Sequence, residues 1–406
     1  MYKINLENLE TKSYKNIPEL NNKRVIVRSC LNVTVNEFGE MFDPTRFDES
    51  LPLIKELALT AKSVIVTAHL GRPKERTSNT SLWNVSQRLQ EELRSSGITL
   101  KLINDLDPAS IEQIQRQDNK NGKVLFLLEN IRYFPGEESK DPIERSNFAA
   151  QLASLADVYV NDAFPDYREA ASTYDIAKLL PSYIGPVFSK EVKAIAKFNN
   201  PDKPFIAVVG GAKLSEKLDA LNALGELADK ILIGGAMAYT LLKAKGIEIG
   251  KSLFEPDKLE VAKEILAKYG SKLVLPVDHL VAGEFAEDSS YEFTINQEVP
   301  VDKIAIDIGW ETIKLFKAEV SNARSILWNG PMGVFEWAHS AVGTEEVGGA
   351  IVNNSGAFKF AGGGDSIAAI NKFQLKGFDH ISTGGGAMLA LLSYDTFPTL
   401  DVILNS

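Results

Sequence analysis

The sequence predicts an α/β fold with two domains, each built on a parallel sheet between layers of helices. Short β-branched or aromatic runs alternate with segments of helical period along nearly all of the 406 residues, as repeated β–α–β units do. That length favours two domains. Three of the apolar runs end in glycine turns, at residues 210–213, 362–365 and 384–386, which is typical of strands that lead into helices at the edge of a parallel sheet.

The first half of the chain supplies the elements of one domain. Segments of helical period cover residues 48–61 and 81–97, and Ser81 and Gly97 are suited to begin and end the second of them. The strand-like runs are residues 24–28, 63–70, 123–130 and 157–164.

The second half repeats this scheme. A helical segment at residues 215–230 is the clearest of its helices, and a further helix over 191–198, capped by Ser189, is expected between the two domains. The strand-like runs are residues 204–209, 230–235, 272–278, 325–330, 358–364 and 380–386.

Composition excludes several classes of protein. A net charge of −10 argues against a protein that coats nucleic acid. The single cysteine, Cys30, cannot form a disulfide framework or a thiolate metal site, and the four histidines lack metal-ligand spacing. The N-terminal segment has no apolar signal-peptide core, and the apolar stretch at 231–242 is too short to span a bilayer. A cytoplasmic protein is expected.

The first glycine turn carries two lysines that indicate a phosphate site. Lys213 and Lys217 are four residues apart and are expected on one face of a helix that begins just after Gly211. Two ammonium groups there repel each other and oppose the helix dipole, unless an anion lies between them. A solvated lysine pair is the alternative.

The other glycine turns and the segment WNGPMGVFEW (328–337) extend this hypothesis. Asp365 is either a helix cap or a Mg²⁺ ligand beside a polyphosphate. Glu336 is placed to accept hydrogen bonds from a ribose, and Val334, Phe335 and Trp337 either face a flat base or pack in the core. One glycine turn alone is equally explained as a tight crossover.

The first half contributes arginines instead of glycines. Arg72, Arg132 and Arg168 each follow a predicted strand, and Arg46 begins a helix after a DPT turn. Residues beyond the carboxyl ends of parallel strands meet at one crevice. Guanidinium groups bind phosphate and carboxylate, so these four arginines with His69 predict a pocket for a small acid of two or three negative charges.

Taken in order, these segments resemble phosphoglycerate kinase from about Lys23 to Leu404. The shared motifs are VRSCLNV, DPTR, HLGRPK, LLENIRY, NDAF, GGAKLSEK, IGGAMAYTLLK, GIEIGKSLF, WNGPMGVFEW, GGGDS and HISTGGGA. The resemblance implies two Rossmann-like three-layer α/β/α domains joined by a helix across a hinge cleft. It implies a triose-binding domain at 1–188, a nucleotide-binding domain at 189–390 and a tail at 391–406 that packs back on the first domain.

The resemblance also implies a reaction and its site. The enzyme would transfer the acyl phosphate of 1,3-bisphosphoglycerate to ADP in glycolysis, reversibly, with Mg²⁺ bound to the nucleotide, as a monomer without nucleic-acid or membrane partners. The catalytic residues would be Arg46, Lys213, Gly385 and Gly386. The triose site would comprise Cys30, Asn32, Arg46, His69, Arg72, Arg132 and Arg168. The nucleotide site would comprise Lys213, Lys217, Asn329, Glu336, Gly363, Gly364, Asp365 and Ser366, with Asp365 toward the metal.

The sequence departs from the family mainly on the triose side. Cys30 stands where the family has aspartate, Ala170 where it has histidine, and one residue is missing before Arg168, so the register of Arg168 is open by one position. Ala236 and Trp310 also replace family residues in two turns. The alternatives are a nucleotide-binding scaffold with weak catalysis and a kinase for another small acid.

Overall fold

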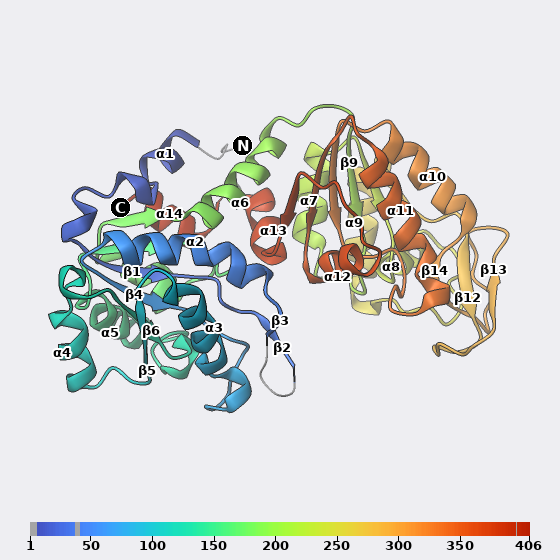
Figure 1. The fold of residues 1–406 in the computed structure, drawn as a ribbon. Coiled ribbons are helices and arrows are strands. Elements are labelled where there is room, and N and C mark those ends of the chain that lie inside the picture. Colours follow the sequence, from blue (N-terminus) through green and yellow to red (C-terminus); the bar gives the residue numbers. More distant parts are fainter. Residues whose placement is uncertain (1–5, 37–40, 395) are drawn as a thin grey trace. The chain divides into compact units, whose positions relative to one another are not determined.

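Two units, each with its own parallel sheet, account for the chain (Figure 1). The computed structural model describes residues 6–36, 41–394 and 396–406. One unit comprises the chain up to Lys193 together with Thr396–Ser406, and the other begins at Ala194. The expected α/β class with two parallel sheets is confirmed. The functional boundaries at residues 188 and 390 stay predictions.

The first unit is built on a six-stranded parallel sheet among the described residues. Its order is β5 (Thr99–Ile103), β6 (Val124–Leu128), β4 (Ser63–Thr67), β1 (Arg24–Arg28), β7 (Val158–Asn161) and β8 (Ser182–Ile184). The four predicted strands are confirmed at its centre. The edge strands β5 and β8 were not predicted from the sequence. Strand β5 is mostly half-exposed and carries a lysine, and β8 has only three residues.

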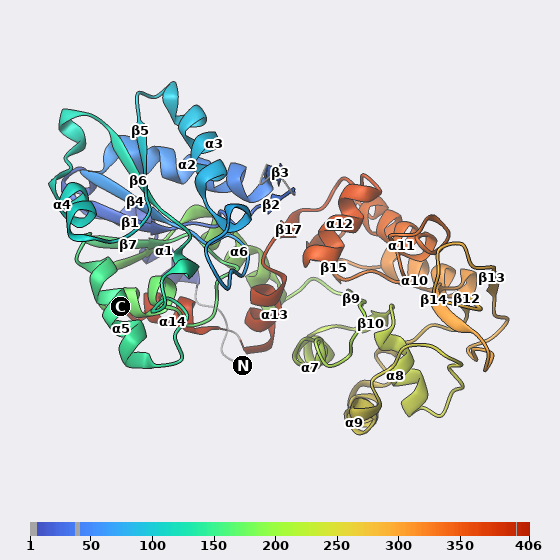
Figure 2. The same cartoon turned by 90° about the horizontal axis from the view of Figure 1, so that it is seen from below.

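Helices cover both faces of this sheet. Figure 2 shows α2 and α3 on one face and α5 and α14 on the other. Leu57 of α2 and Leu89 of α3 are fully buried against Val25 and Val64 of the central strands. The helices are α1 (Leu6–Thr11), α2 (Thr45–Thr60), α3 (Trp83–Arg94), α4 (Pro108–Arg116), α5 (Pro142–Ala153), α6 (Pro186–Ala196) and α14 (Pro398–Leu404). Two short strands, β2 (Thr34–Val35) and β3 (Met41–Asp43), form a small antiparallel sheet.

Helix α6 begins earlier than the sequence predicts. The expected cap at Ser189 is wrong, because the helix starts at Pro186 and the amide of Ser189 already donates to the carbonyl of Gly185. The buried carboxylate of Asp162, just after β7, accepts hydrogen bonds from the amides of Val187 (2.8 Å) and Phe188 (3.1 Å). The side chain that satisfies the first turn therefore comes from a distant part of the chain.

The C-terminal helix α14 belongs to the first unit. The ring of Phe397 contacts those of Phe164 and Phe188, with centroids 5.8 and 6.0 Å apart. The ammonium of Lys12 donates to the backbone oxygen of Ser406. An aromatic cluster thus fixes the end of the chain beside β7 and α6.

The second unit has the same plan with one addition. Its described six-stranded parallel sheet has the order β11 (Leu273–Val274), β10 (Lys230–Ile233), β9 (Phe205–Val209), β15 (Ser325–Asn329), β16 (Phe358–Gly362) and β17 (His380–Ser382). Each predicted strand is confirmed. An antiparallel sheet of β13 (Tyr291–Phe293), β12 (His279–Ala282) and β14 (Ile304–Ile308) was not predicted from the sequence.

Helices again lie on both faces of the larger sheet, with α7, α8 and α9 on one and α10, α11 and α12 on the other (Figure 2). Trp328, Phe316 and Ile351 form part of the core on the second face. The helices are α7 (Leu218–Leu227), α8 (Met237–Ala244), α9 (Leu259–Tyr269), α10 (Trp310–Ser321), α11 (Val342–Asn353), α12 (Gly364–Lys372) and α13 (Gly385–Tyr394). Over the described ranges, no single helix has the length and apolarity to cross a membrane, although the bent pair α13 and α14 passes that test together.

Candidate active site

Four loops meet at the carboxyl edge of the first sheet. Arg28, the last residue of β1, lies opposite Thr67 of β4 and Asn161 of β7. The segments that follow these strands are joined by backbone hydrogen bonds, from Asp162 to the carbonyl of Arg28 (2.8 Å) and from Ile131 to that of Ala68 (2.9 Å). The loops that carry the predicted arginines are therefore held together by the sheet.

Three of the predicted triose residues meet around one glycine turn. Asn32 accepts a hydrogen bond from the amide of Gly71 on its side-chain oxygen (2.9 Å), and its carbonyl accepts one from the Arg46 guanidinium (2.8 Å). Arg132 donates to the carbonyl of Gly71 (2.7 Å). Gly71 has φ +64°, which favours glycine at this bend. Arg46 is placed by the start of α2, where the amide of Thr45 donates to the carboxylate of Asp43 (3.0 Å).

The remaining predicted residues of this side differ in exposure. Arg72 and Arg168 are exposed, and the Arg168 guanidinium lies 5.5 Å from the ring centre of Tyr167. Cys30 is only 4% exposed, and burial raises the pKa of its thiol to about 12. The thiol is therefore neutral and cannot accept hydrogen bonds as a carboxylate does.

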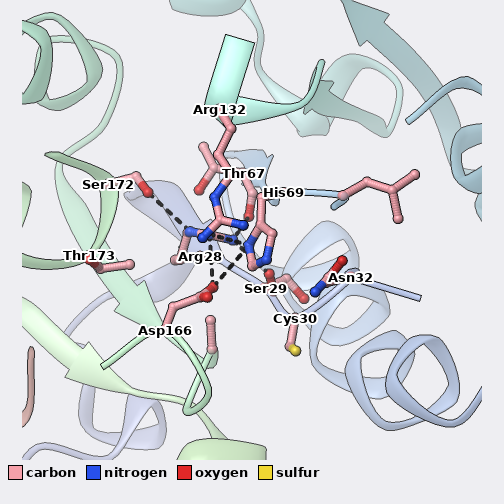
Figure 3. Close-up of polar contacts among 12 residues, drawn as sticks. Arg28, Ser29, Cys30, Asn32, Thr67, His69, Arg132, Asp166, Ser172 and Thr173 are labelled. Carbon is pink, nitrogen blue, oxygen red and sulfur yellow. Dashed lines mark hydrogen bonds and ion pairs between the residues drawn. The ribbon is translucent and has the colours of Figure 1, made fainter. Parts of the chain in front are cut away.

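His69 belongs to a buried charged network that the sequence analysis missed (Figure 3). Arg28 Nη2 lies 2.8 Å from Asp166 Oδ2 and 2.9 Å from His69 Nδ1, and Arg28 Nε donates to Ser172 Oγ (3.0 Å). Ser172 in turn donates through its hydroxyl (2.6 Å) and amide (3.0 Å) to Glu137. The network joins the loops after β1, β4 and β7 with a glutamate that follows β6.

Burial and charge shift the ionisation of this network in opposing directions. Burial raises the pKa of Glu137 to about 7, although Arg28 partly offsets it. Burial alone would also raise the pKa of Asp166, but the neighbouring Arg28 guanidinium, 2.8 Å away, holds it well below its usual value. Burial lowers the pKa of His69, so the imidazole is neutral at pH 7.

One general signal could have found this network. An arginine at the end of a fully buried strand needs a counter-ion, because a buried guanidinium without one is strongly destabilising. Arg28, which is 2% exposed, ends the apolar run RVIVR. Sequence spacing gives no means to pair it with Asp166, 138 positions along.

Backbone packing dominates the corresponding edge of the second sheet. A Cβ added to Gly210 would lie 1.9 Å from the carbonyl oxygen of Pro331, and one added to Gly330 would lie 2.2 Å from that of Gly210. A Cβ on Gly385 would lie 2.6 Å from the Cα of Gly363. Side chains are excluded here because neighbouring turns pack main chain against main chain. The glycine turns are thus a packed layer of backbone as well as a candidate phosphate site.

The predicted helix over the two lysines is wrong. Helix α7 begins at Leu218, with Lys217 at its N-cap, so Lys213 and Lys217 lie in the preceding turns and do not share a helical face. Lys213 is exposed, 3.6 Å from Glu216. The Lys217 ammonium donates to Asn329, and burial lowers its pKa although Asp365 partly offsets this. The irregular turn is held from outside the segment, since the amide of Ser215 donates to the carboxylate of Glu255 (3.0 Å).

Asn329 and Ser366 tie the second glycine turn to its neighbours. Asn329 donates to the carbonyl of Gly362 (2.6 Å), and Ser366 accepts from the amide of Gly330 (2.7 Å) while donating to the same carbonyl (2.9 Å). Gly363, Gly364 and Gly386 lie at or near the starts of α12 and α13. The predicted nucleotide residues Asn329, at the end of β15, and Ser366, in α12, are therefore brought together around the carbonyl of Gly362.

In the segment after β15, some side chains pack in the core and others are exposed. Phe335 is buried in the core, and Trp337 packs on Phe285 with ring centres 4.7 Å apart. Glu336 is exposed, and its carbonyl accepts from Lys372 (2.8 Å). The core interpretation thus holds for Phe335.

Asp365 fits a metal that arrives with its nucleotide. Its carboxylate is exposed in the first turn of α12, and the N-cap of that helix is Gly363 instead. Within residues 6–36, 41–394 and 396–406, no group of three or more His, Cys, Asp or Glu side chains is arranged to hold an ion. A single carboxylate suits Mg²⁺ when phosphates and waters supply the other ligands.

Comparison with known proteins agrees with this arrangement. The family model described as phosphoglycerate kinase matches residues 15–394. A phosphoglycerate kinase of Koribacter versatilis is 42% identical over 95% of this chain and 98% of its own, and one of a Mycobacterium species is 41% identical over 95% and 96%.

Solved structures are similar over the same extent. Phosphoglycerate kinase from Coxiella burnetii has a TM-score of 0.84 at 33% identity, covering 97% of this chain and 98% of that one. The enzyme from Pyrococcus horikoshii has a TM-score of 0.81 at 30% identity, covering 96% and 98%. The chain belongs to the phosphoglycerate kinase family, and it is a kinase that uses a carboxyl group as acceptor.

Proposed function

We propose that this kinase moves the acyl phosphate of 1,3-bisphosphoglycerate to ADP, forming 3-phosphoglycerate and ATP in a reversible glycolytic step. The linked cluster of Asn32, Arg46 and Arg132 around Gly71 is the observation that carries the proposal. Two guanidinium groups held beside one turn suit an acid that carries both carboxylate and phosphate.

The triose acid would be held by residues of the first unit. Arg46 and Arg132 would bind its charged ends, the exposed Arg72 and Arg168 would complete the cationic lining, and His69 would donate a hydrogen bond as a neutral imidazole. Asn32 and Cys30 line the same loops. This set supports an anion site because four of its members are permanently charged cations.

The nucleotide would be held by residues of the second unit. Lys213 and Lys217 would contact its phosphates, Asn329 and Ser366 would fix the turn around them, and Glu336 would contact the ribose. The amides of Gly363, Gly364, Gly385 and Gly386 at the starts of α12 and α13 would face phosphate oxygens. Mg²⁺ bound with the nucleotide, beside Asp365, would neutralise charge on the phosphates.

Catalysis would come from position and charge alone. The acceptor is a carboxylate or a phosphate oxygen that is already ionised, so the reaction needs no general base. Arg46 from one unit and Lys213 from the other would stabilise the equatorial oxygens during in-line transfer. We propose that a hinge at α6 closes to bring them together and to exclude water, which limits hydrolysis of the acyl phosphate.

The cellular setting is proposed on composition. The acidic net charge of −10 and a single buried cysteine suit a cytoplasmic monomer with small-molecule substrates and no nucleic-acid or membrane partner.

Two measurements test the proposal. ATP formation from 1,3-bisphosphoglycerate and Mg-ADP, coupled to a second ATP-consuming enzyme, should be far above background, and no turnover would refute the proposed reaction. Small-angle scattering should show compaction only when both substrates are bound. An unchanged radius of gyration would refute the proposed closure.

A further inference from the structure

We propose that Asp166 is a positioning residue of the triose site: it holds Arg28 against His69 Nδ1, so that His69 presents its Nε2–H to the bound acid. The proposal deepens the function proposed above and rests on it for the identity of that acid. It assigns a role to a carboxylate that would otherwise repel an anionic substrate.

The first step is the geometry of three side chains from three loops. Asp166 Oδ2 lies 2.8 Å from Arg28 Nη2 and 3.3 Å from His69 Nδ1, while Arg28 Nη2 lies 2.9 Å from the same imidazole nitrogen. Arg28 and His69 are only 2% and 5% exposed. Figure 3 shows the carboxylate, the guanidinium and the imidazole facing one another. Two side chains so buried, with the partly buried Asp166 beside them, restrict one another to a single arrangement.

The second step is the proton on His69. A guanidinium nitrogen has hydrogens and no free acceptor, so the 2.9 Å contact with Arg28 makes His69 Nδ1 an acceptor. A proton on Nδ1 would place two N–H groups against each other at that distance. The contact with Asp166 is longer, at 3.3 Å. The geometry therefore selects the neutral tautomer with its proton on Nε2, a donor for a carboxylate or phosphate oxygen.

The third step is why Arg28 needs Asp166. The other guanidinium nitrogens of Arg28 donate to Ser172 Oγ and to the carbonyls of Ser29 and Thr67, at 3.0, 3.0 and 3.5 Å. These are neutral acceptors, and they do not balance a charge buried at the end of β1. Asp166 supplies the direct ion pair and leaves Arg28 with no donor for the substrate. Arg28 is thus a fixed part of the frame around His69.

A second arginine–aspartate pair on the same strands gives a matched control. Arg24 begins β1 and pairs with Asp157, just before β7, at 2.7 Å. Asp166 follows β7, so the two pairs lie at opposite ends of the same two neighbouring strands. The Arg24–Asp157 pair is partly exposed and lies away from the carboxyl edge. Removing either aspartate deletes one negative charge and breaks one ion pair with an arginine of β1. Only Asp166 also contacts His69.

The first experiment measures the tautomer without using activity. Two-bond ¹H–¹⁵N spectra of the full chain, with His69 identified by the signals lost in His69→Gln, report which imidazole nitrogen carries the proton. We expect Nδ1 to be unprotonated and Nε2 protonated in the free protein at pH 7. In Asp166→Asn we expect a mixture of tautomers, and in Asp157→Asn the wild-type pattern.

The second experiment separates binding from turnover. Asp166→Asn should raise KM for 3-phosphoglycerate about tenfold, since a fixed donor to a charged oxygen is lost, while KM for ATP and kcat change by less than about twofold. Asp157→Asn should leave all three unchanged.

Several outcomes would overturn the proposal. A protonated Nδ1 in the wild-type protein does so even if Asp166→Asn fails to fold, and so does a single unchanged tautomer in the variant. A lower KM for the triose acid in Asp166→Asn would mean that the carboxylate only repels it. Absence of kinase activity in the wild-type chain would refute the proposed function, while the spectra would still decide the arrangement of His69.

Discussion

The two sheets of this kinase end in carboxyl edges built by different means. In the first unit, ionisable side chains such as Arg28, Asp166 and Glu137 fill the edge and are joined by hydrogen bonds and ion pairs. In the second, turns such as Gly210 and Gly330 pack main chain on main chain. A small acid needs convergent guanidinium and imidazole groups, whereas a polyphosphate chain can lie against amides. Substitutions that change charge should therefore harm the edge of the first sheet most, and substitutions that add volume should harm the edge of the second.

The largest effect is expected for the cation proposed to act on the phosphoryl group. Lys213→Ala should lower kcat about a thousandfold, or about 4 kcal/mol of transition-state stabilisation, with a much smaller change in ADP binding. Steady-state kinetics and calorimetry of nucleotide binding check this. Lys263→Ala is the matched control, since Lys263 is also exposed and pairs with a glutamate three positions away, at 2.7 Å. Equal losses of kcat and affinity for Lys213→Ala would contradict the role.

Shape is tested by adding one methyl group. Gly210→Ala should destabilise the second unit by about 3 kcal/mol, because its Cβ would lie 1.9 Å from a backbone oxygen and the turn must move. Gly349→Ala in α11 is the control, since no heavy atom lies within 4 Å of its added Cβ. It should be neutral or stabilising by up to about 1 kcal/mol. Urea unfolding measures both. Equal stabilities of the two variants would rule out the steric account.

The pH dependence of stability tests the charged edge. Glu137 has a folded pKa of about 7 against an ordinary value of 4.5, so between these pH values the unfolded chain binds fewer protons than the folded one. Stability must then fall as pH rises through this window, by at most about 3 kcal/mol. Glu137→Gln should remove that fall. Unfolding curves of the two proteins that run parallel from pH 4.5 to 7 would show that Glu137 is ionised throughout.

The smallest effect is expected at the far end of the same strands. Asp157→Asn should cost less than about 1 kcal/mol of unfolding free energy, because the Arg24–Asp157 pair is partly exposed and screened by water. Thermal unfolding in low and high salt measures it. A loss of several kcal/mol would mean that the two arginine–aspartate pairs are energetically alike, and would remove the contrast between the ends of β1 and β7.

The sequence predicted repeating structure better than local exceptions. The central strands, such as β1 and β9, are continuous apolar runs, and both their existence and their order along the chain were recognised. The helix over Lys213 and Lys217 was wrong, because the amide of Ser215 between them donates to the distant Glu255 and helix α7 begins only at Leu218. Helix α6 was placed too late, because its first turn is capped by Asp162 from a distant loop.

Site residues were likewise predicted where the signal is local in sequence, and missed where it depends on contacts between distant segments. Motif residues close in sequence to a strand end, such as Asn32 and Arg132, do meet at one edge. The pairing of Arg28 with Asp166 depends on the neighbouring positions of β1 and β7, which are far apart in sequence. Periodicity and spacing carry no information on such contacts.

The packed glycines also limit how this protein can change over evolutionary time. With the turns at Gly210, Gly235 and Gly330 pressed against one another's main chain, a new side chain at one of them requires simultaneous rebuilding of the next. Single substitutions cannot explore this layer. New nucleotide preferences would have to arise at exposed positions around this layer, such as Glu336. The glycines of the layer itself would be retained together.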